Sequence, residues 1–240
     1  MELIIQDVKK SFQQQQVLNG INLHIQTHEF ICVLGHSGCG KSTLLNLLAG
    51  FTRPDSGSVV VDGEHVKSPS KDRGVVFQEH ALFPWYTVLE NVLFGPDVQG
   101  IDKKEAEQKA RKYLNMTGLG EYADHYPSQL SGGMKQRVGI ARALAAEPKI
   151  LLMDEPFGAL DVFTKENMRN ELIDIWSNLK TTIIFITHDI SEAIYLADRI
   201  IVMKEGYVAS DMKVNIPRPR QYTDDGFAEM AVEIERTLVQ

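Results

Sequence analysis

The stretch "GHSGCGKST" (residues 35–43) decides the fold that we expect for this chain. It matches the pattern G-x-x-x-x-G-K-[ST], follows the apolar run "EFICVLG" (29–35) and precedes the helix-forming run "TLLNLLAG" (43–50). A glycine loop between a strand and a helix can surround a phosphate with backbone N–H groups. A glycine turn that only caps a helix needs neither Lys41 nor Ser42. The stretch therefore predicts a phosphate-binding loop, and we expect an α/β fold around it.

Each part of this glycine loop has an expected role toward a nucleoside triphosphate. Lys41 would neutralise the β- and γ-phosphates, the Ser42 hydroxyl would ligate Mg²⁺, and Thr43 would donate near the α-phosphate. Cys39 is interpreted as a small filler, although a helix N-terminus can also activate a thiol. The predicted ATP-binding residues of the loop are Gly35, His36, Ser37, Gly38, Cys39, Gly40, Lys41, Ser42 and Thr43.

Two adjacent carboxylates follow another apolar run, in "KILLMDEP" (149–156). Ile150 to Met153 predict a buried strand, and neighbouring strand side chains point to opposite faces. Asp154 can therefore face a Mg²⁺ ion while Glu155 faces a separate volume that holds an attacking water. We predict Asp154 as a metal ligand and Glu155 as the general base or water-orienting residue. An exposed acidic pair is the alternative, and the presence of the glycine loop disfavours it.

The stretch "LSGGMKQR" (130–137) offers a second place for a phosphate, at the start of a predicted helix. Ser131 and the backbone N–H groups of Gly132 and Gly133 can hold a terminal phosphate. The stretch follows no predicted strand and has no acidic strand end of its own, so it cannot bind a whole nucleotide. It predicts half of a nucleotide site.

The overall composition narrows the classes of function. The chain has 240 residues and a net charge of −7, which argues against sequence-independent nucleic-acid binding and against a polybasic membrane anchor. No apolar run approaches the ~18 residues of a membrane helix, and the N-terminal stretch lacks a secretory pattern. Cys32 and Cys39 predict neither a disulfide framework nor a metal site. These features favour a protein of the reducing cytoplasm.

Short β-branched runs alternate with helical patterns along the chain, which predicts a parallel α/β core. From about Trp85 to Glu147 the pattern is helical and predicts an insert of roughly sixty residues. A proline-broken tail with a short final helix ends the sequence. The expected domains are a catalytic core of residues 1–84 and 148–215, a helical subdomain of residues 85–147 and a C-terminal tail of residues 216–240.

Because these motifs occur together and in this order, the chain resembles the nucleotide-binding subunit of ATP-binding cassette (ABC) transporters along nearly its whole length. The resemblance implies the ABC ATPase fold, which is a P-loop NTPase core with a mixed sheet, an N-terminal antiparallel β part and a helical insert. It also implies ATP hydrolysis in a head-to-tail dimer, where Ser131, Gly132 and Gly133 contact the ATP held by the other subunit. The family's usual Gln after "LSGG" is Met134 here, so the polar contact of that Gln is missing.

Four further residues match elements of the family. Gln78 in "VVFQ" resembles the Q-loop, which senses Mg²⁺ and water, and Asp161 in "GALD" resembles the D-loop near the opposite subunit. His188 in "FITHD" resembles the switch histidine at the γ-phosphate, although a lone strand-end histidine is more often structural. Phe12 takes the place of the adenine-stacking aromatic residue, with a core phenylalanine as the rival interpretation. The Mg²⁺ ligands implied are Ser42, Gln78 and Asp154.

An aromatic run follows the Q-loop, from Phe83 to Tyr86. In a lone domain this run would usually be core packing, but the resemblance implies a groove that receives a coupling helix of a membrane subunit. The partners implied are a second nucleotide-binding subunit, as a homodimer, integral membrane permease subunits that dock near Gln78–Tyr86, and indirectly a solute-binding protein. No nucleic-acid partner is expected.

Three stretches, "ALFPWYTVLENV", "LSGGMKQR" and "IPRPR", resemble the importers for nitrate, sulfonate and taurine. The resemblance implies a peripheral protein on the cytoplasmic face of the inner membrane that powers uptake of a small anionic solute. Two other classes stay open. One is a soluble ABC ATPase that acts on nucleic acid or ribosomes, which the acidic charge disfavours. The other is a kinase-like P-loop enzyme, which would not need "LSGGMKQR".

Overall fold

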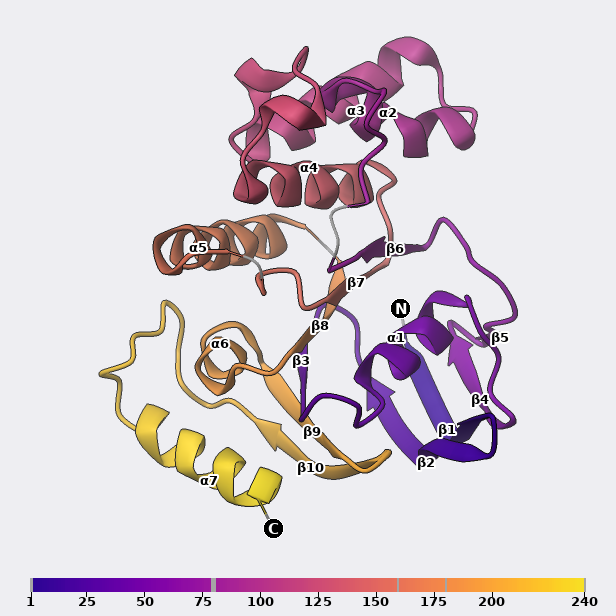
Figure 1. Ribbon diagram of the computed structural model, residues 1–240, viewed down its shortest axis with the longest axis vertical. Coiled ribbons are helices and arrows are strands. Elements are labelled where there is room, and N and C mark those ends of the chain that lie inside the picture. The colour runs from indigo at the N-terminus through magenta and orange to yellow at the C-terminus, as the bar shows by residue number, and fades with distance from the viewer. Residues whose placement is uncertain (1, 79–80, 159, 180, 240) are drawn as a thin grey trace. The chain divides into compact units, whose positions relative to one another are not determined.

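The computed structural model describes residues 2–78, 81–158, 160–179 and 181–239 (Figure 1). The chain divides into two compact units. The first unit consists of Met1–Ser70 and Thr182–Gln240, and the second consists of Lys71–Thr181. The predicted helical segment, residues 85–147, lies within the second unit.

One sheet of the first unit contains β1 (Leu3–Phe12), β2 (Gln15–Ile25), β4 (Ser56–Val61) and β5 (Glu64–His65). Its order is β2-β1-β4-β5, and all its pairs are antiparallel. Leu3 and Ile5 of β1 are buried while the residue between them is only half-buried, which is the alternation of a sheet with one face on the core. The N-terminal antiparallel β part is thus confirmed.

The other strands of the first unit are β3 (Phe30–Leu34), β8 (Thr182–Thr187), β9 (Arg199–Lys204) and β10 (Tyr207–Lys213). β3 pairs in parallel with β8 and with β9, and β10 pairs antiparallel with β9. Every residue of β3 and β8 is buried, which explains their continuous apolar sequences. The predicted parallel strands of this unit are therefore confirmed.

Three helices of the first unit are α1 (Lys41–Ala49), α6 (Ile190–Leu196) and α7 (Phe227–Val239). α1 begins within the glycine loop motif, as predicted. α6 packs on β3 and β8, and α7 packs on α6 and β9 (Figure 1). The final helix was expected from the sequence, whereas α6 was not.

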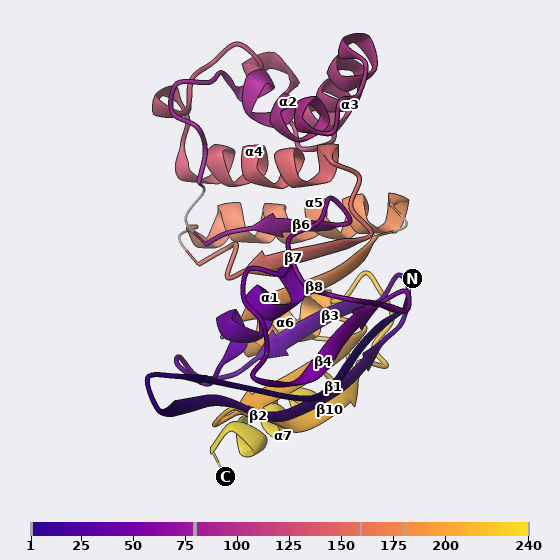
Figure 2. The same ribbon diagram turned by 90° about the vertical axis from the view of Figure 1, so that its right-hand side faces the viewer.

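The second unit contains β6 (Arg73–Val76), β7 (Ile150–Asp154), α2 (Val88–Val98), α3 (Lys103–Met116), α4 (Gly132–Ala145), α5 (Val162–Asn178) and the 3₁₀ turns Gly120–Tyr122 and Pro127–Gln129. β6 and β7 pair in parallel. α2, α3 and α4 pack on one another (Figure 2). Within the described part of the chain, no helix has the length and apolar composition that crossing a bilayer requires.

Local side-chain chemistry fixes where these helices begin and end. The Thr87 hydroxyl accepts from the Glu90 N–H, and the Glu90 carboxylate accepts from the Thr87 N–H, so α2 starts with a capping box. Asp102 caps α3 by accepting from two backbone N–H groups. Gly118, with a φ of +67°, follows α3 and ends it, as its sequence predicts.

Candidate functional site

The glycine loop joins the buried strand β3 to α1 and depends on its glycines for its shape. Gly38 and Gly40 have φ values of +81° and +105°, a region that other residues rarely adopt. A Cβ on Gly35 would lie 2.4 Å from the carbonyl oxygen of Met203, closer than any side chain tolerates. The loop is therefore held by its own backbone geometry and by contact with β9.

Lys41, the first residue of α1, folds back over the loop. It is only 5% exposed, and its Nζ donates to the carbonyl oxygens of Gly35 at 2.8 Å and His36 at 3.0 Å. A buried ammonium is costly unless its protons are bonded. Because an ammonium has three N–H donors, these two bonds leave a third for a phosphate oxygen.

The N-terminus of α1 differs from those of other helices in how its amides are satisfied. Its N-cap is Gly40, which makes no side-chain hydrogen bond to the first turn. Each helix from α2 to α6, in contrast, starts at a side chain that accepts from a backbone N–H. Those capping residues are Thr87, Asp102, Ser131, Asp161 and Asp189. An anion in the glycine loop would supply the acceptor that α1 lacks, and the helix dipole favours it.

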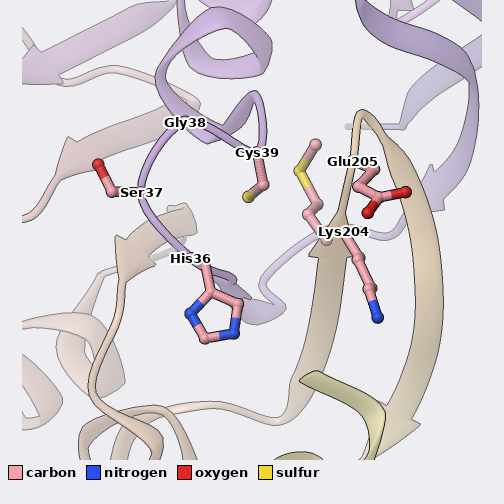
Figure 3. Close-up of a pocket in the computed structure, with 7 residues that line it drawn as sticks. His36, Ser37, Gly38, Cys39, Lys204 and Glu205 are labelled. Atoms are coloured by element: carbon pink, nitrogen blue, oxygen red, sulfur yellow. The ribbon is translucent and has the colours of Figure 1, made fainter. Parts of the chain in front are cut away.

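A cavity of about 280 Å³ lies beside the loop and is lined by residues 36–39 and 203–205 (Figure 3). His36 and Cys39 line it from the loop, while Lys204 lines it from the end of β9 and Glu205 from the following turn. Burial raises the pKa of the Cys39 thiol, so the thiol stays protonated at neutral pH. This burial agrees with the interpretation of Cys39 as a filler.

Phe12, at the end of β1, is 48% exposed and is therefore not a core residue. The Lys10 ammonium lies 5.3 Å from the centroid of its ring, in the range of a cation–π contact. Lys10 is itself fixed by an ion pair with Asp55 at 2.7 Å. One face of the Phe12 ring is thus covered by a cation.

His188 follows the last residue of β8 and is exposed, although its neighbour Thr187 is buried. Asp189 comes next and caps α6 by accepting from the Glu192 N–H at 3.1 Å. The exposed imidazole therefore projects from a turn whose flanking residues are both hydrogen-bonded. The first unit holds Phe12, the glycine loop and His188.

In the second unit, β7 ends at Asp154, and Glu155 lies in the following turn. Glu155 has a φ of +42°, and its carbonyl oxygen accepts from the Gly158 N–H at 3.1 Å. The expected placement of the two carboxylates on opposite faces of one strand is therefore wrong, because strand alternation stops before Glu155. Both side chains are half-buried.

The predicted half-site forms the start of α4. The Ser131 hydroxyl accepts from the Met134 N–H at 3.3 Å, so Ser131 is the N-cap. Capping uses a lone pair of the hydroxyl and leaves its proton for donation to a phosphate. A Cβ on Gly133 would lie 2.7 Å from the Thr164 methyl group, whereas nothing lies within 4 Å of one on Gly132. Packing against α5 therefore requires a glycine at position 133, whereas the surrounding contacts would allow a side chain at position 132.

Asp161 is the N-cap of α5, the next helix. Its carboxylate accepts from the Thr164 N–H at 3.0 Å and from the Thr164 hydroxyl at 2.6 Å. These hydrogen bonds lower the pKa of Asp161, so it is ionised at neutral pH. Ala159 of the same "GALD" stretch lies outside the described residues.

The segment after β6 carries a partly exposed aromatic cluster that we define as Phe83, Trp85, Tyr86 and Phe94. Phe83 is the common neighbour, with ring centroids 5.8 Å from Trp85, 5.5 Å from Tyr86 and 4.7 Å from Phe94. Trp85 is 67% exposed, whereas Phe83 and Tyr86 are half-buried, so the run is only partly packed into the unit. Gln78 is also exposed, and the adjacent Glu79 and His80 lie outside the described residues.

Two residues that support this cluster were missed by sequence reasoning. Asn91 is fully buried in α2, and its side chain bonds the backbone of Phe83, Tyr86 and Thr87 at 2.9–3.1 Å. The Arg142 guanidinium lies 5.6 Å from the Phe83 ring centroid. A lone Asn among the apolar residues of a helix was the available signal, because a buried amide needs polar partners.

The geometry of the glycine loop and the alternating β and α elements place the chain in the class of P-loop nucleoside triphosphatases. The comparison with family models makes this more specific. The model described as ABC transporter matches residues 18–158, more than half of the chain, and the chain belongs to the ABC transporter family.

Individual relatives match over most of their length. The nitrate import ATP-binding protein NrtD of Synechocystis sp. is 50% identical over 223 residues, which are 90% of this chain and 84% of that protein. The aliphatic sulfonates import ATP-binding protein SsuB of Bacillus cereus is 44% identical over 98% of this chain and 94% of that protein. One similar solved structure is the ATP-binding cassette MJ0796 in a dimeric post-hydrolysis state bound to ADP and Pi. Its TM-score is 0.79 at 35% identity, and the alignment spans 89% of this chain and 99% of that chain. The chain has the fold of an ABC ATPase cassette.

Proposed function

We propose that the chain is the ATP-hydrolysing subunit of an ABC importer, a translocase that powers uptake of a small anionic solute. The observation that carries this proposal is the glycine loop, where Lys41 is bonded inside the loop and the α1 N-terminus has no side-chain cap. Two relatives named as import ATP-binding proteins support the direction of transport. The solved cassette with ADP and Pi supports hydrolysis.

In this proposal ATP binds with its phosphates in the glycine loop and its base on Phe12. The amides of residues 35–43 and the Lys41 ammonium hold the phosphates. Adenine stacks on the face of Phe12 that Lys10 does not cover. Such stacking contributes ~1–3 kcal/mol, by analogy with bases in single-stranded nucleic acids.

The donors proposed for Mg²⁺ are the Ser42 hydroxyl, the Gln78 side-chain carbonyl and the Asp154 carboxylate. All three are oxygen donors, which suit a hard cation. Mg²⁺ is usually held by one or two carboxylates together with substrate phosphates, and the described residues form no separate cluster of three His, Cys, Asp or Glu side chains. The donor set therefore fits Mg²⁺ bound with ATP, where the ion would neutralise phosphate charge.

Hydrolysis in this proposal uses Glu155 and His188. Glu155 orients and deprotonates the attacking water, and His188 donates to the γ-phosphate. Glu155 is half-buried in the turn directly after β7, next to the proposed metal ligand Asp154.

A second copy of the chain completes each ATP site in this proposal. Ser131, Gly132 and Gly133 of one copy donate to the γ-phosphate that the other copy holds, with Asp161 near the same contact. The glycine loop supplies the buried Lys41 ammonium, and the stretch at Ser131 supplies a capping hydroxyl that keeps its proton for donation. The dimeric state of the solved cassette supports this arrangement. ATP then closes the dimer, and hydrolysis removes the contact.

Ser131→Arg is expected to abolish ATP turnover while ATP binding to the glycine loop changes by less than about threefold. The arginine side chain would fill the place of the γ-phosphate in the facing copy and block closure. Phosphate release and binding of a fluorescent ATP analogue measure the two effects. Ser128→Arg, at an exposed serine nearby, is the matched control. Equal loss of binding and turnover in Ser131→Arg would contradict a site shared between two copies.

The proposed membrane partner is a pair of integral permease subunits that dock near Gln78–Tyr86. Trp85 is the most exposed residue of the aromatic cluster, and the Asn91 side chain bonds the Tyr86 carbonyl oxygen next to it, so the cluster offers aromatic surface on a hydrogen-bonded turn. Aromatic anchors of this kind suit the docking of a short helix. This docking would hold the chain at the cytoplasmic face of the inner membrane, where its contact with a solute-binding protein is indirect.

Trp85→Ala is expected to keep the ATPase rate of the isolated chain but to lose association with permease-containing membranes by about tenfold or more. The ring is exposed, so its removal costs little folding stability. Co-sedimentation with membranes that contain the permease subunits measures the loss. Tyr126→Ala, at another exposed aromatic residue of the second unit, is the control. Unchanged co-sedimentation of Trp85→Ala would contradict docking at this cluster.

The proposed solute is a small anion of the nitrate, sulfonate or taurine kind. Labelled nitrate and an aliphatic sulfonate, offered to cells with and without the chain, test uptake directly.

Phosphate release by the purified chain tests hydrolysis, and a kinase-like enzyme would instead transfer phosphate to an acceptor. Co-purification with nucleic acid or ribosomes instead of membranes would favour the alternative, a soluble ABC ATPase. The net charge of −7 disfavours that alternative.

A further inference from the structure

The segment after β10 holds the short helix α6 by its carboxyl end. Arg220 is only 3% exposed. Its guanidinium donates to four carbonyl oxygens, those of Ile194 (2.6 Å), Tyr195 (3.3 Å), Ala197 (2.6 Å) and Ile216 (2.7 Å). Three of them belong to the last turn and C-cap of α6, where a helix cannot satisfy its own carbonyls. Burial and then the charge of Arg218 lower the pKa of Arg220 to about 10, so it stays charged at neutral pH.

Arg218 ties the same helix end to the strand that leads into the glycine loop. Its guanidinium donates to the Leu196 carbonyl oxygen and to the Asp198 carboxylate. Asp198 in turn accepts from the Phe30 N–H at 3.0 Å through its carboxylate and donates to the Phe30 carbonyl oxygen at 2.7 Å through its own N–H. Phe30 is the first residue of β3, so the tail and the strand before the loop are joined through the end of α6.

The amino end of α6 is fixed by a second set of bonds. The Thr187 hydroxyl donates to the Glu192 carboxylate and accepts from the Asp189 N–H at 3.1 Å. Thr187 and Glu192 are 2% and 3% exposed, so this pair is buried in the first unit. His188 lies between Thr187 and Asp189, and the positions of both neighbours depend on Glu192.

We propose that Arg220, supported by Arg218, is a positioning residue for His188, because it holds α6 in place from the end opposite the histidine. The inference rests on the proposed role of His188. α6 spans seven residues, and isolated helices shorter than ~12–15 residues are marginal in water. Without its carboxyl end fixed, the helix would fray and the turn at His188 would sample several positions. The C-terminal tail thereby acts on hydrolysis without touching the nucleotide.

The test compares Arg220→Ala, Arg220→Lys, His188→Ala and the double variant Arg220→Ala/His188→Ala in the full chain. We expect Arg220→Ala to lose about tenfold in kcat while KM for MgATP changes by less than about twofold. Arg220→Lys should recover part of kcat because it keeps the charge but bonds fewer carbonyls. The double variant should be no slower than His188→Ala, because the two residues act as a unit.

Hydrogen exchange gives a readout that does not depend on activity. The amides of residues 187–197 should exchange faster in Arg220→Ala than in Arg236→Ala, a control at an exposed arginine of α7. If Arg220→Ala does not fold, Arg220→Lys and its double variant with His188→Ala carry the same comparison.

Two results would overturn the proposal. One is a wild-type kcat in Arg220→Ala despite faster exchange, and the other is a double variant whose loss is the product of the two single losses. The second result would mean that Arg220 acts by another route. A wild-type chain that releases no phosphate would refute the proposed function itself. Either of the two results above, in a wild-type chain that does release phosphate, would refute the positioning role alone.

Discussion

Lys41→Ala is expected to lower the ATPase rate by about 100-fold or more and to weaken ATP binding. The change removes the only charge that the structure buries inside the glycine loop and leaves the carbonyl oxygens of Gly35 and His36 without their donor. Two phosphates would then face these carbonyls without a neutralising ammonium. Phosphate release with MgATP and binding of a fluorescent ATP analogue measure both effects.

The control for this prediction is Lys104→Ala, at an exposed lysine of α3, which should keep its rate within about twofold of the wild type. The Tm of both variants separates a catalytic loss from unfolding. A folded Lys41→Ala variant that hydrolyses ATP at the wild-type rate would show that the glycine loop is not the hydrolytic site.

Glu155→Gln is expected to slow hydrolysis by about 10²–10⁴-fold while ATP binding is retained. An amide occupies nearly the same volume as the carboxylate but cannot take a proton from water at neutral pH. Because the γ-phosphate then persists, it keeps bridging two copies, and the variant should elute as a dimer with ATP and as a monomer without it. Size-exclusion chromatography with light scattering measures the shift.

Glu121→Gln, at an exposed glutamate of the second unit, controls for the loss of one negative charge. Adding Ser131→Arg to Glu155→Gln should abolish the ATP-dependent dimer. A Glu155→Gln monomer that hydrolyses ATP normally contradicts the general-base role. A slow variant that stays monomeric with ATP contradicts the shared site.

Predictions from sequence succeeded where the signal lay within one short segment. β3 and β8 are buried at every residue, and their apolar runs predict this burial without information from the rest of the chain. The glycine loop is equally local, because its glycines, lysine and serine lie within nine positions. The start of α4 at Ser131 and the end of α3 before Gly118 follow from capping preferences.

Other elements could not be predicted because their stabilising contacts lie far away in the chain. α6 has seven residues and no strong period of its own, and it is held by Arg218 and Arg220 from the tail. β10 has no fully buried residue, so it shows no apolar run, and its pairing with β9 defines it. The buried role of Asn91 depends on the turn above it.

The sequence by itself determined which residues can bind a phosphate, since the spacing of glycine, lysine and serine in the loop and the predicted half-site at Ser131 are local patterns. Only the tertiary structure decided how these groups are held. In the folded chain Glu155 lies outside the strand, and the α1 N-terminus has no side-chain cap although α2 to α6 have one. The tail is bonded to α6, the helix that follows His188. The physical reason is distance along the chain: a backbone carbonyl at residue 194 finds its donor at residue 220 only after folding has brought them together.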